Sequence, residues 1–322
     1  LLTGLLAGSY PALVLSSFQP GAILHRTAGK GINLRKGLVV SQFALSILLI
    51  ICTVVVFSQI EYIKNRDIGY DKDNIIYISM DGESNANTEV LKAELMLHPD
   101  IRNASRVLQL PVSNNSVMGE PSWEGQEEGN DVRFSFQIAD FDFVQTFDIE
   151  MAMGRDLSEK IVADVGNYLL NEEAVRQMGL SDPIGKQFDF WGRKGQITGV
   201  VRDFNYQELD TKIAPLVISP APWGFALVNS SNLAVRIYPG DPAAAIDHLK
   251  STWERINPGY SFEYRFLDDT YNQLYQNVNR LEQILLLFTV LAILISSLGL
   301  FSLSAFNAEQ RSKEISVRKV LG

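Results

Sequence analysis

Two long runs of apolar residues stand out from an otherwise mixed chain. Residues 37–60 form 24 consecutive uncharged positions and residues 283–308 form 26, and both runs are rich in Leu, Ile, Val and Phe. A helix needs roughly 20 apolar residues to cross a hydrocarbon core about 30 Å thick. We therefore expect transmembrane helices over 37–60 and 284–306. A pair of buried core helices is the alternative, but such helices rarely extend so far without a charge.

A third, shorter apolar run opens the sequence. Residues 1–15 carry no charge and include Pro11, but they are too few to span a bilayer. No basic segment precedes them and no small-residue cleavage site clearly follows, which disfavours a signal peptide. We expect 1–15 to be the end of a truncated transmembrane helix and 16–36 to be a cytoplasmic linker, in a chain trimmed at both ends.

The distribution of charge predicts which side of the membrane each part occupies. Residues 61–282 carry 20 Lys and Arg against 35 Asp and Glu, whereas four basic residues and no acidic one precede the first span. Four basic and two acidic residues follow the second span. Short loops rich in Lys and Arg stay in the cytoplasm. Both flanks are therefore predicted to be cytoplasmic and the acidic middle to be exported.

The exported middle, 61–267, alternates between strand-like and helix-like patterns. Asn171 is suited to cap a helix in which Glu172 and Glu173 favour the positive end of the dipole, and Gly179 is suited to end it. Further helices are expected over 88–97 and from Asp241-Pro242 to about residue 256, and strands over 75–78, 132–138, 196–201, 216–219, 233–238 and 262–266. These patterns predict an α+β extracytoplasmic domain, which we expect to form two lobes. The one cysteine, Cys52, lies in the first apolar run, so this domain forms no disulfide.

A narrow apolar stripe precedes the second span. It comprises Tyr271, Leu274, Tyr275, Val278 and Leu281. This spacing is typical of a seam between two helices. We predict a stalk helix over 268–283, capped by Asp268 and continuous with the span, which at ~1.5 Å per residue makes 269–306 about 57 Å long. A stalk that carries motion and a passive spacer are both compatible with this pattern.

The segment 307–322 after the second span is predicted to be a short charged helix. Glu309 and Lys313, like Glu314 and Arg318, stand four residues apart in the favourable acidic-first order. Apolar residues lie between these charges. Such a helix suits either lipid headgroups or a docking site on a cytoplasmic partner, and the residues alone leave both open.

No reactive grouping stands out. The three histidines are widely spaced, and Asp140 and Asp142 are better placed to cap a helix near residue 143 than to act as a catalytic pair. Between Gly179 and Gly185 five residues intervene instead of the four of a phosphate loop, and Gln187 stands where Ser or Thr is needed. We expect no catalytic residues, no cofactor and no metal in this chain. The tryptophans Trp123, Trp191 and Trp223 fit core packing better than a binding surface.

Several segments resemble those of a known family. The run GLFSLSAFNAEQRSKEISVRKVLG, residues 299–322, is similar to the segment that follows a transmembrane helix in FtsX-like permeases, the family that includes MacB-type exporters and lipoprotein-releasing permeases. In the exported domain the similar segments are Asn171-Glu172, Pro183-Ile184-Gly185-Lys186, Gly199-Val200-Val201-Arg202-Asp203-Phe204 and Gly154-Arg155, and near the start Ala7-Gly8-Ser9-Tyr10-Pro11-Ala12. The resemblance covers most of the chain and is most specific at its C-terminal end.

The resemblance implies a dimeric, non-catalytic permease subunit in a bacterial cytoplasmic membrane. ATP and Mg²⁺ would belong to a separate ABC ATPase, and other expected partners are a second permease copy, membrane lipid and a periplasmic protein, without nucleic acid. The ATPase-coupling residues implied are Glu309, Arg311, Lys313, Glu314, Arg318 and Lys319. ATP-driven closure would pass up the stalk to the exported domain. The family's remaining spans are absent from this chain, and nothing in the exported residues selects a substrate.

Two alternatives come from other classes of protein. A membrane sensor, such as a receptor kinase, shares the topology of two spans around an exported domain but needs a long cytoplasmic signalling region. A membrane-anchored exported enzyme is less favoured, because no catalytic grouping was found.

Overall fold

The computed structural model describes residues 29–64, 67–112, 114, 116, 121–207, 211–220, 230–274 and 276–321. The chain divides into two compact units. One comprises Leu1–Ile60 with Val278–Gly322, and the other comprises Glu61–Asn277. The predicted segment 1–15 and the cytoplasmic linker up to residue 28 lie outside the described residues.

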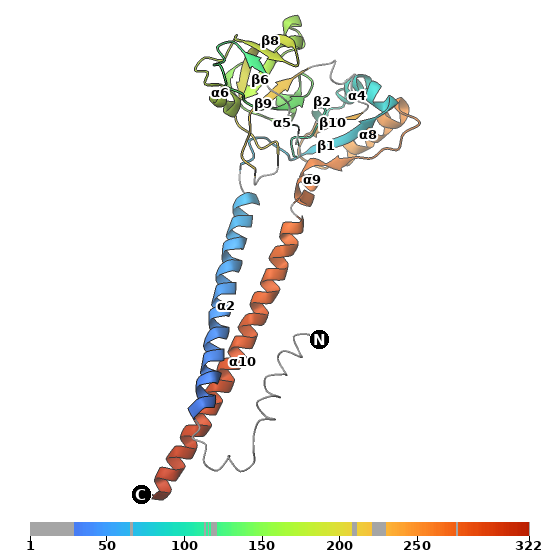
Figure 1. The fold of residues 1–322 in the computed structure, drawn as a ribbon. Helices are drawn as coiled ribbons and strands as arrows, with labels where there is room; N and C mark the ends of the chain where they lie inside the picture. The colour runs from blue at the N-terminus through green and yellow to red at the C-terminus, as the bar shows by residue number, and fades with distance from the viewer. Residues whose placement is uncertain are drawn as a thin grey trace. The chain divides into compact units, whose positions relative to one another are not determined.

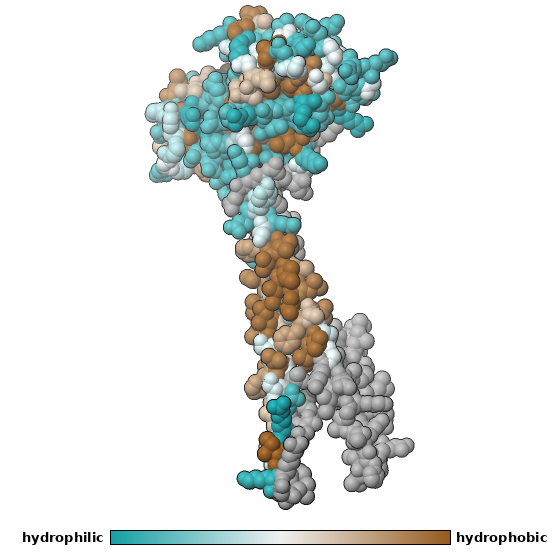
Figure 2. Space-filling view, turned by 90° about the vertical axis from the view of Figure 1, so that its left-hand side faces the viewer, coloured by the Kyte–Doolittle hydropathy of each residue, from teal (hydrophilic) through white to brown (hydrophobic). Residues whose placement is uncertain are grey.

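The first unit consists of two long helices, α2 (Gly29–Lys64) and α10 (Gln276–Leu321) (Figure 1). Each contains a stretch long and apolar enough to cross a membrane, Val39–Tyr62 and Gln283–Glu309, with mean hydropathy values of 2.6 and 2.7. Only 11% of each stretch is buried within the protein. Large apolar side chains cover the outside, as the brown band in Figure 2 shows. This surface fits lipid or other helices better than water, and the two stretches overlap the predicted spans.

The second unit begins with an antiparallel sheet of four strands in the order β11-β1-β10-β2. Its strands are β1 (Ile75–Asp81), β2 (Ile101–Val107), β10 (Ser230–Ile237) and β11 (Arg265–Phe266). The helices α4 (Thr88–Leu95) and α8 (Ala243–Ile256) cover one face, where Ile76, Leu91 and Leu249 are fully buried. The alternation of apolar residues along β1 and β10 directs every second side chain into this core.

A larger mixed sheet follows the order β3-β7-β8-β6-β9-β4, with β5 also pairing with β8. Its strands are β3 (Ser122–Trp123), β4 (Ser135–Ile138), β5 (Met151–Gly154), β6 (Tyr168–Asn171), β7 (Gln187–Phe190), β8 (Arg193–Val201) and β9 (Leu216–Ser219). Strand β8 contacts β5, β6 and β7, so it lies at the centre of this sheet. Helix α6 (Glu172–Met178) packs on the sheet through the buried Ala174 and Met178.

A third core joins the two sheets. It contains Ile75 and Val107 from the first sheet and Leu169 and Val201 from the second, together with Phe147 of α5 (Phe143–Phe147). Residues 61–277 therefore form one compact α+β unit with two sheets, and the predicted division into two lobes stays a prediction.

Most of the predicted elements of this unit are present, with shifted ends. The helix predicted over 88–97 ends at Leu95, the strand predicted over 132–138 begins at Ser135, and the strand predicted over 262–266 pairs only at Arg265–Phe266. The helix predicted from Asp241-Pro242 instead begins at Ala243, and the Ala243 N–H donates to Asp241 Oδ1 at 3.0 Å. Element ends are the least determined part of a sequence pattern.

Candidate functional site

The two long helices meet through pairs of hydroxyl groups. Ser46 Oγ and Ser296 Oγ lie 2.6 Å apart, and Thr53 Oγ1 and Thr289 Oγ1 lie 2.7 Å apart. All four side chains are buried, whereas most of their apolar neighbours are exposed. In a membrane, hydroxyl contacts between helices contribute roughly 0.6–2 kcal/mol each. Small polar residues therefore form the contact between the spans, and the apolar faces point outward.

The threonine hydroxyls also contact backbone carbonyls of their own helices. Thr53 Oγ1 lies 2.8 Å from the carbonyl oxygen of Leu49, and Thr289 Oγ1 lies 2.8 Å from that of Leu285. Each hydroxyl has one proton, so one threonine donates to the carbonyl of its own helix while the other donates to its partner's hydroxyl. Close approach continues at Gly299, where an added Cβ would lie 3.1 Å from Gln42 Oε1. The two spans therefore run antiparallel, as helices that cross a membrane in opposite directions must. The paired residues also define one register between them.

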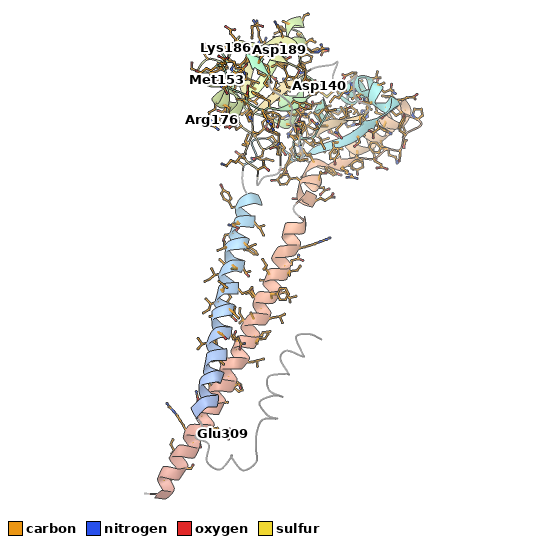
Figure 3. The ribbon with its side chains drawn as sticks, in the orientation of Figure 1. Asp140, Met153, Arg176, Lys186, Asp189 and Glu309 are labelled. Carbon is orange, nitrogen blue, oxygen red and sulfur yellow. The ribbon has the colours of Figure 1, made fainter. Side chains whose placement is uncertain are left out.

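The predicted ATPase-coupling segment is a continuation of α10 (Figure 3). The side chains of Glu309, Arg311 and Lys319 are exposed. The side chains of Lys313, Glu314 and Arg318 lie outside the described part of the structure, so the two predicted ion pairs stay predictions. No break in the helix separates the apolar stretch from this charged segment.

The structure places one member of the predicted stalk seam elsewhere. Tyr271 of α9 (Leu267–Leu274) is 7% exposed and belongs to the core that joins the two sheets, with Lys72 Nζ 5.3 Å from the centre of its ring. Residue 275 is outside the described residues, as are the side chains of Leu274, Val278 and Leu281. The chain is helical on both sides of residue 275, and the seam itself stays a prediction.

Two of the segments that carry the family resemblance meet at Asn171. Its side chain is fully buried, and its Oδ1 accepts from the N–H groups of Ala174 at 3.0 Å and Leu216 at 2.8 Å. Its Nδ2 donates to Asp203 Oδ1 at 2.9 Å and to the carbonyl of Ala214 at 3.0 Å. Burial raises the pKa of the Asp203 carboxyl, although it accepts a hydrogen bond from a backbone N–H. Asn171 therefore both caps α6, as predicted, and joins it to β9 and to the segment after β8.

Gly154 and Arg155, the second resembling segment, have structural roles of their own. Gly154 has a φ of +69°, and a Cβ there would lie 2.5 Å from the carbonyl oxygen of Thr198. Arg155 then makes a bidentate contact with Asp164, at 2.6 and 3.0 Å, which lowers the pKa of that carboxyl. Asp164 lies in the 3-10 helix η2 (Val162–Gly166) and has no exposed side-chain surface. This pair fixes η2 against the end of β5.

A third resembling segment, Pro183–Lys186, also packs on β8. The N–H of Gly185 donates to the carbonyl of Ile197 at 2.8 Å, and the N–H of Ile197 donates to that of Lys186 at 3.0 Å. The segments that suggested the family in the exported domain are therefore clustered around one strand, and their interactions are structural. None of them forms a catalytic grouping.

The prediction that Asp140 and Asp142 cap a helix near residue 143 is confirmed in position and wrong in its bond. Asp142 occupies the N-cap position of α5, which begins at Phe143, but no side-chain capping bond forms there. Both carboxylates instead contact Lys92 Nζ of α4, with Asp142 Oδ2 at 2.6 Å. Burial lowers the pKa of Lys92, but the two carboxylates outweigh it and the pKa is raised. Asp140, labelled in Figure 3, also accepts from Ser105 Oγ at 2.6 Å and from the Arg106 N–H at 2.8 Å.

A second buried charge fixes the start of the exported unit. Arg236 of β10 has 3% of its side chain exposed and donates to the Asp71 carboxylate and to the Asp71 carbonyl, both at 2.7 Å. Its Nε donates to the carbonyl of Thr146 in α5 at 2.5 Å. The segment that follows α2 in sequence is thereby bound to the central strands of the first sheet.

The aromatic and histidine side chains divide between core and surface. Trp123 is 6% exposed and agrees with core packing, whereas Trp191 is 39% exposed with its ring centre 4.9 Å from that of Phe136; Trp223 lies outside the described residues. His98 and His248 stack at 4.5 Å between ring centres. Among the residues that the structure describes, no group of three His, Cys, Asp or Glu side chains is placed to hold a metal ion.

The fold is that of an α+β unit that lies in sequence between two helices long and apolar enough to span a membrane. The model of the MacB-like periplasmic core domain matches residues 38–251, well over half of the chain. The chain therefore belongs to the MacB/FtsX-like family of ABC transporter permeases. An inner-membrane protein with an extracytoplasmic segment is consistent with this assignment. No curated protein matches the chain.

Solved structures that match parts of the chain come from three bacterial sources. The periplasmic region of MacB from Actinobacillus actinomycetemcomitans is 15% identical, with a TM-score of 0.45, and covers 66% of this chain and 98% of that one. The extracellular domain of the noncanonic ABC-type transporter YknZ from Gram-positive bacteria is 11% identical, with a TM-score of 0.41, at 59% and 97% coverage. A domain of a putative permease protein from Porphyromonas gingivalis is 17% identical, with a TM-score of 0.42, at 60% and 85% coverage.

Proposed function

We propose that this permease chain couples ATP hydrolysis by a separate ABC ATPase to movement of its extracytoplasmic domain. The observation that supports this most directly is the continuity of α10. One helix of 46 residues, about 69 Å at ~1.5 Å per residue, includes both the apolar stretch and the charged segment after it. A displacement of the charged end is transmitted along such a helix, because its backbone hydrogen bonds resist bending.

The hydroxyl pairs between the spans support transmission by two helices together. Because Ser46 bonds to Ser296 and Thr53 bonds to Thr289, sliding of α10 alone breaks both contacts. Breaking buried polar contacts in a membrane has a free-energy cost, so the pair is expected to move as one body. The charged end of α10 is the proposed docking segment for the ATPase, with Glu309, Arg311 and Lys319 exposed there.

The assembly proposed is a dimer of permease chains with further spans in each, in contact with lipid and with a periplasmic protein. The exposed apolar side chains of α2 and α10 support contacts with a second permease chain and with lipid, since the part of the chain that the structure describes leaves them uncovered. The competing proposal, a membrane sensor, shares the topology but has no support from the family match.

The test is affinity purification of the protein from its native membrane, as wild type and with Glu314→Lys plus Arg318→Glu. The double variant keeps the net charge but reverses the charges at two of the six coupling residues, Glu314 and Arg318. We expect an ABC ATPase to copurify with the wild type and to be lost from the double variant. Absence of any ATPase from the wild-type sample contradicts the proposal and favours the sensor.

A matched control reverses a comparable pair elsewhere. Asp247→Lys plus Lys250→Glu changes two exposed residues of α8 and also leaves the net charge unchanged. We expect this variant to retain the ATPase. Loss of the ATPase from both variants means that the effect is not specific to the coupling segment, and the assignment of that segment is then wrong.

A further inference from the structure

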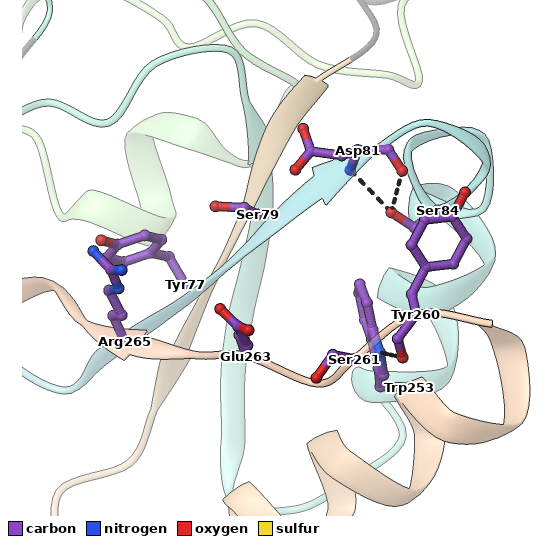
Figure 4. Close-up of a pocket in the computed structure, with 9 residues that line it drawn as sticks. All are labelled: Tyr77, Ser79, Asp81, Ser84, Trp253, Tyr260, Ser261, Glu263 and Arg265. Carbon is purple, nitrogen blue, oxygen red and sulfur yellow. Dashed lines mark hydrogen bonds between the residues drawn. The ribbon is translucent and has the colours of Figure 1, made fainter. Parts of the chain in front are cut away.

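The first sheet of the exported unit contains a strand whose outer edge is only partly paired. Strand β1 pairs with β10 at all seven positions, Ile75–Asp81, but with β11 only at Ile76 and Tyr77. The residues that precede Arg265 no longer pair with β1, so the edge of β1 beyond Tyr77 has no neighbouring strand within the described ranges. A cavity of about 360 Å³ lies at this point, between the end of β1 and the segment before β11 (Figure 4). Its lining residues are Tyr77, Ser79, Asp81, Ser84, Trp253, Tyr260, Ser261, Glu263 and Arg265.

The direction of the β1 backbone groups follows from hydrogen bonds at its two ends. The N–H of Ile237 donates to the carbonyl of Asn74, the residue before β1, at 2.9 Å, so this carbonyl faces β10, whereas both backbone groups of Asp81 bond to Ser84 Oγ on the other side. Because these groups alternate along a strand, those of Tyr77, Ser79 and Asp81 face the other edge. Tyr77 is paired there with Arg265 of β11.

The two remaining positions, Ser79 and Asp81, differ in whether their backbone groups have hydrogen-bond partners. Ser84 Oγ accepts from the Asp81 N–H at 2.9 Å and donates to the Asp81 carbonyl at 2.7 Å, so both groups of Asp81 are satisfied. The N–H and carbonyl of Ser79 face the cavity and have no hydrogen-bond partner among the described residues. An extended peptide adds to a sheet through such a donor and acceptor pair.

The side chains around the cavity favour a basic ligand. Asp81 and Glu263 carry negative charge and Arg265 carries the one opposing positive charge of the lining. In Figure 4 Arg265 and Tyr77 lie at one end and Asp81 at the other, with Glu263 between them. The positive charge is therefore at the end already occupied by β11, and the open end is acidic.

The aromatic wall of the cavity is held in place. Trp253 Nε1 donates to the carbonyl of Tyr260 at 3.1 Å, and the N–H of Glu83 donates to the Tyr260 hydroxyl at 3.0 Å. Aromatic rings beside carboxylates are suited to the methylene groups and the cation of a lysine or arginine side chain. The site thus combines a fixed wall, an unpaired backbone position and a negative charge.

We propose that this cavity binds an extended segment of an exported partner protein that carries a basic side chain. The segment adds a short strand at Ser79 and places its cation between Asp81 and Glu263. This inference does not depend on coupling to an ATPase, since it concerns only residues of the exported unit. The volume is within the range of small-ligand pockets, so a few residues of the partner occupy it.

The probes are three fluorescent pentapeptides titrated against the full chain in detergent micelles, with binding followed by fluorescence anisotropy. The first is Val-Lys-Val-Lys-Val, the second has Glu in place of Lys, and the third is the Lys peptide with its central amide N-methylated. We expect the Lys peptide to bind at least about fivefold more tightly than the other two. Equal binding of the Lys and Glu peptides, or undiminished binding of the methylated one, overturns the proposal, as does an absence of binding up to about 1 mM.

Substitutions in the chain, in place of changes in the peptide, test the same contacts. Glu263→Lys should reverse the preference, so that the Glu peptide binds more tightly than the Lys peptide. Ser79→Pro removes an N–H that β10 does not use, together with the hydroxyl that donates to Asn232 Oδ1 at 3.4 Å, and it should weaken binding of the Lys peptide by about fivefold or more. Glu159→Lys, an exposed carboxylate outside the cavity, is the control and should leave the preference unchanged. A preference that Glu263→Lys leaves unaltered contradicts this site, and a reversal cannot result from misfolding.

Discussion

Ser46 Oγ lies 2.6 Å from Ser296 Oγ, and the same contact recurs between Thr53 and Thr289, seven residues along each helix and in the opposite order. Two such contacts define the register of the antiparallel pair, because a slip by one residue separates both. The positions are small polar residues within otherwise apolar runs, a pattern that membrane helices use for close packing.

The first prediction tests this register by disulfide formation. In a background with Cys52→Ser, we expect Ser46→Cys plus Ser296→Cys to cross-link under mild oxidation, and likewise Thr53→Cys plus Thr289→Cys. The reason is that atoms at these side-chain positions already lie 2.6 and 2.7 Å apart. A disulfide needs the two Cβ atoms at about 3.5–4.5 Å, which this proximity permits. Loss of one free thiol pair on mass spectrometry is the measurement.

The mismatched pair is the control for that experiment. Ser46→Cys plus Thr289→Cys places the thiols about one heptad apart along the helices, roughly 10 Å at ~1.5 Å per residue. We expect no intramolecular cross-link. Equal cross-linking of matched and mismatched pairs would show that the helices slide freely, and the proposed joint movement of the spans would lose its support.

The second prediction concerns Asn171. Replacing it with alanine removes the cap of α6 and leaves the buried Leu216 N–H without this partner, whereas the Ala214 carbonyl keeps its hydrogen bond from the Tyr206 hydroxyl. A lost cap costs about 1 kcal/mol and an unsatisfied buried group about 1–3 kcal/mol, so the free energy of unfolding should fall by about 2–4 kcal/mol. Chemical denaturation followed by tryptophan fluorescence measures this, since every tryptophan lies in residues 61–277. Gln177→Ala, an exposed change on the same helix, should stay within about 0.5 kcal/mol of the wild type.

The local sequence around Asn171 is sufficient to predict helix α6, but not the distant hydrogen bonds of Asn171. The cap, the two glutamates after it and the closing glycine lie within nine residues, so propensity and dipole arguments locate α6 correctly. The bonds from Asn171 to Asp203, Ala214 and Leu216 span 32 to 45 residues. No periodicity encodes such separations, and only the pairing of β6 with β8 and β9 produces them.

The same limit explains the elements and contacts that the sequence pattern missed. Strand β2 contains Asn103, Ser105 and Arg106, and its polar residues hide its alternation. Ser105 is nevertheless fully buried, because its hydroxyl donates to Asp140. Asp140 and Asp142 stand two residues apart, so the sequence favoured a local role as helix caps. Their partner Lys92 is 48 residues from Asp140, and local sequence gives no sign of such a contact. The apolar spans needed no such information, since length and absence of charge suffice to predict them.

The third prediction compares two glycines with similar backbone conformations. Gly154 and Gly185 have φ values of +69° and +81°. An added Cβ at Gly154 lies 2.5 Å from the Thr198 carbonyl oxygen, whereas at Gly185 it meets nothing within 4 Å. Gly185→Ala should therefore cost only the conformational strain of about 1–2 kcal/mol. Gly154→Ala adds a backbone clash, and its loss of stability should exceed that of Gly185→Ala by about 2 kcal/mol or more. Equal losses in denaturation experiments would contradict the close approach of β5 and β8.

The fourth prediction concerns the pH dependence of stability through Asp156. Burial raises the pKa of this carboxyl from 3.8 to about 6, and the nearby charges of Asp142 and Asp164 add to the effect. Its Oδ1 accepts from the Leu157 N–H at 2.7 Å, but its Oδ2 has no partner among the described residues. The folded state therefore holds a proton that the unfolded state releases. The resulting stabilisation is present below pH 4 and is lost as the pH rises to about 6.

Asp156→Asn isolates this effect, because the amide is uncharged at every pH and nearly the same size. Ionisation of Asp156 at neutral pH costs about 1–3 kcal/mol once partial solvent screening is allowed for, so the variant should be more stable than the wild type by that amount at pH 7. At pH 3.5 the two proteins should be nearly equally stable, since Asp156 is then protonated in the folded protein. Denaturation curves at pH 3.5, 5 and 7 measure the difference, with the exposed Asp131→Asn as the control that should show no such trend. A variant less stable than the wild type at pH 7 would mean that the Asp156 carboxylate is stabilised by a partner, and that its negative charge supports the fold.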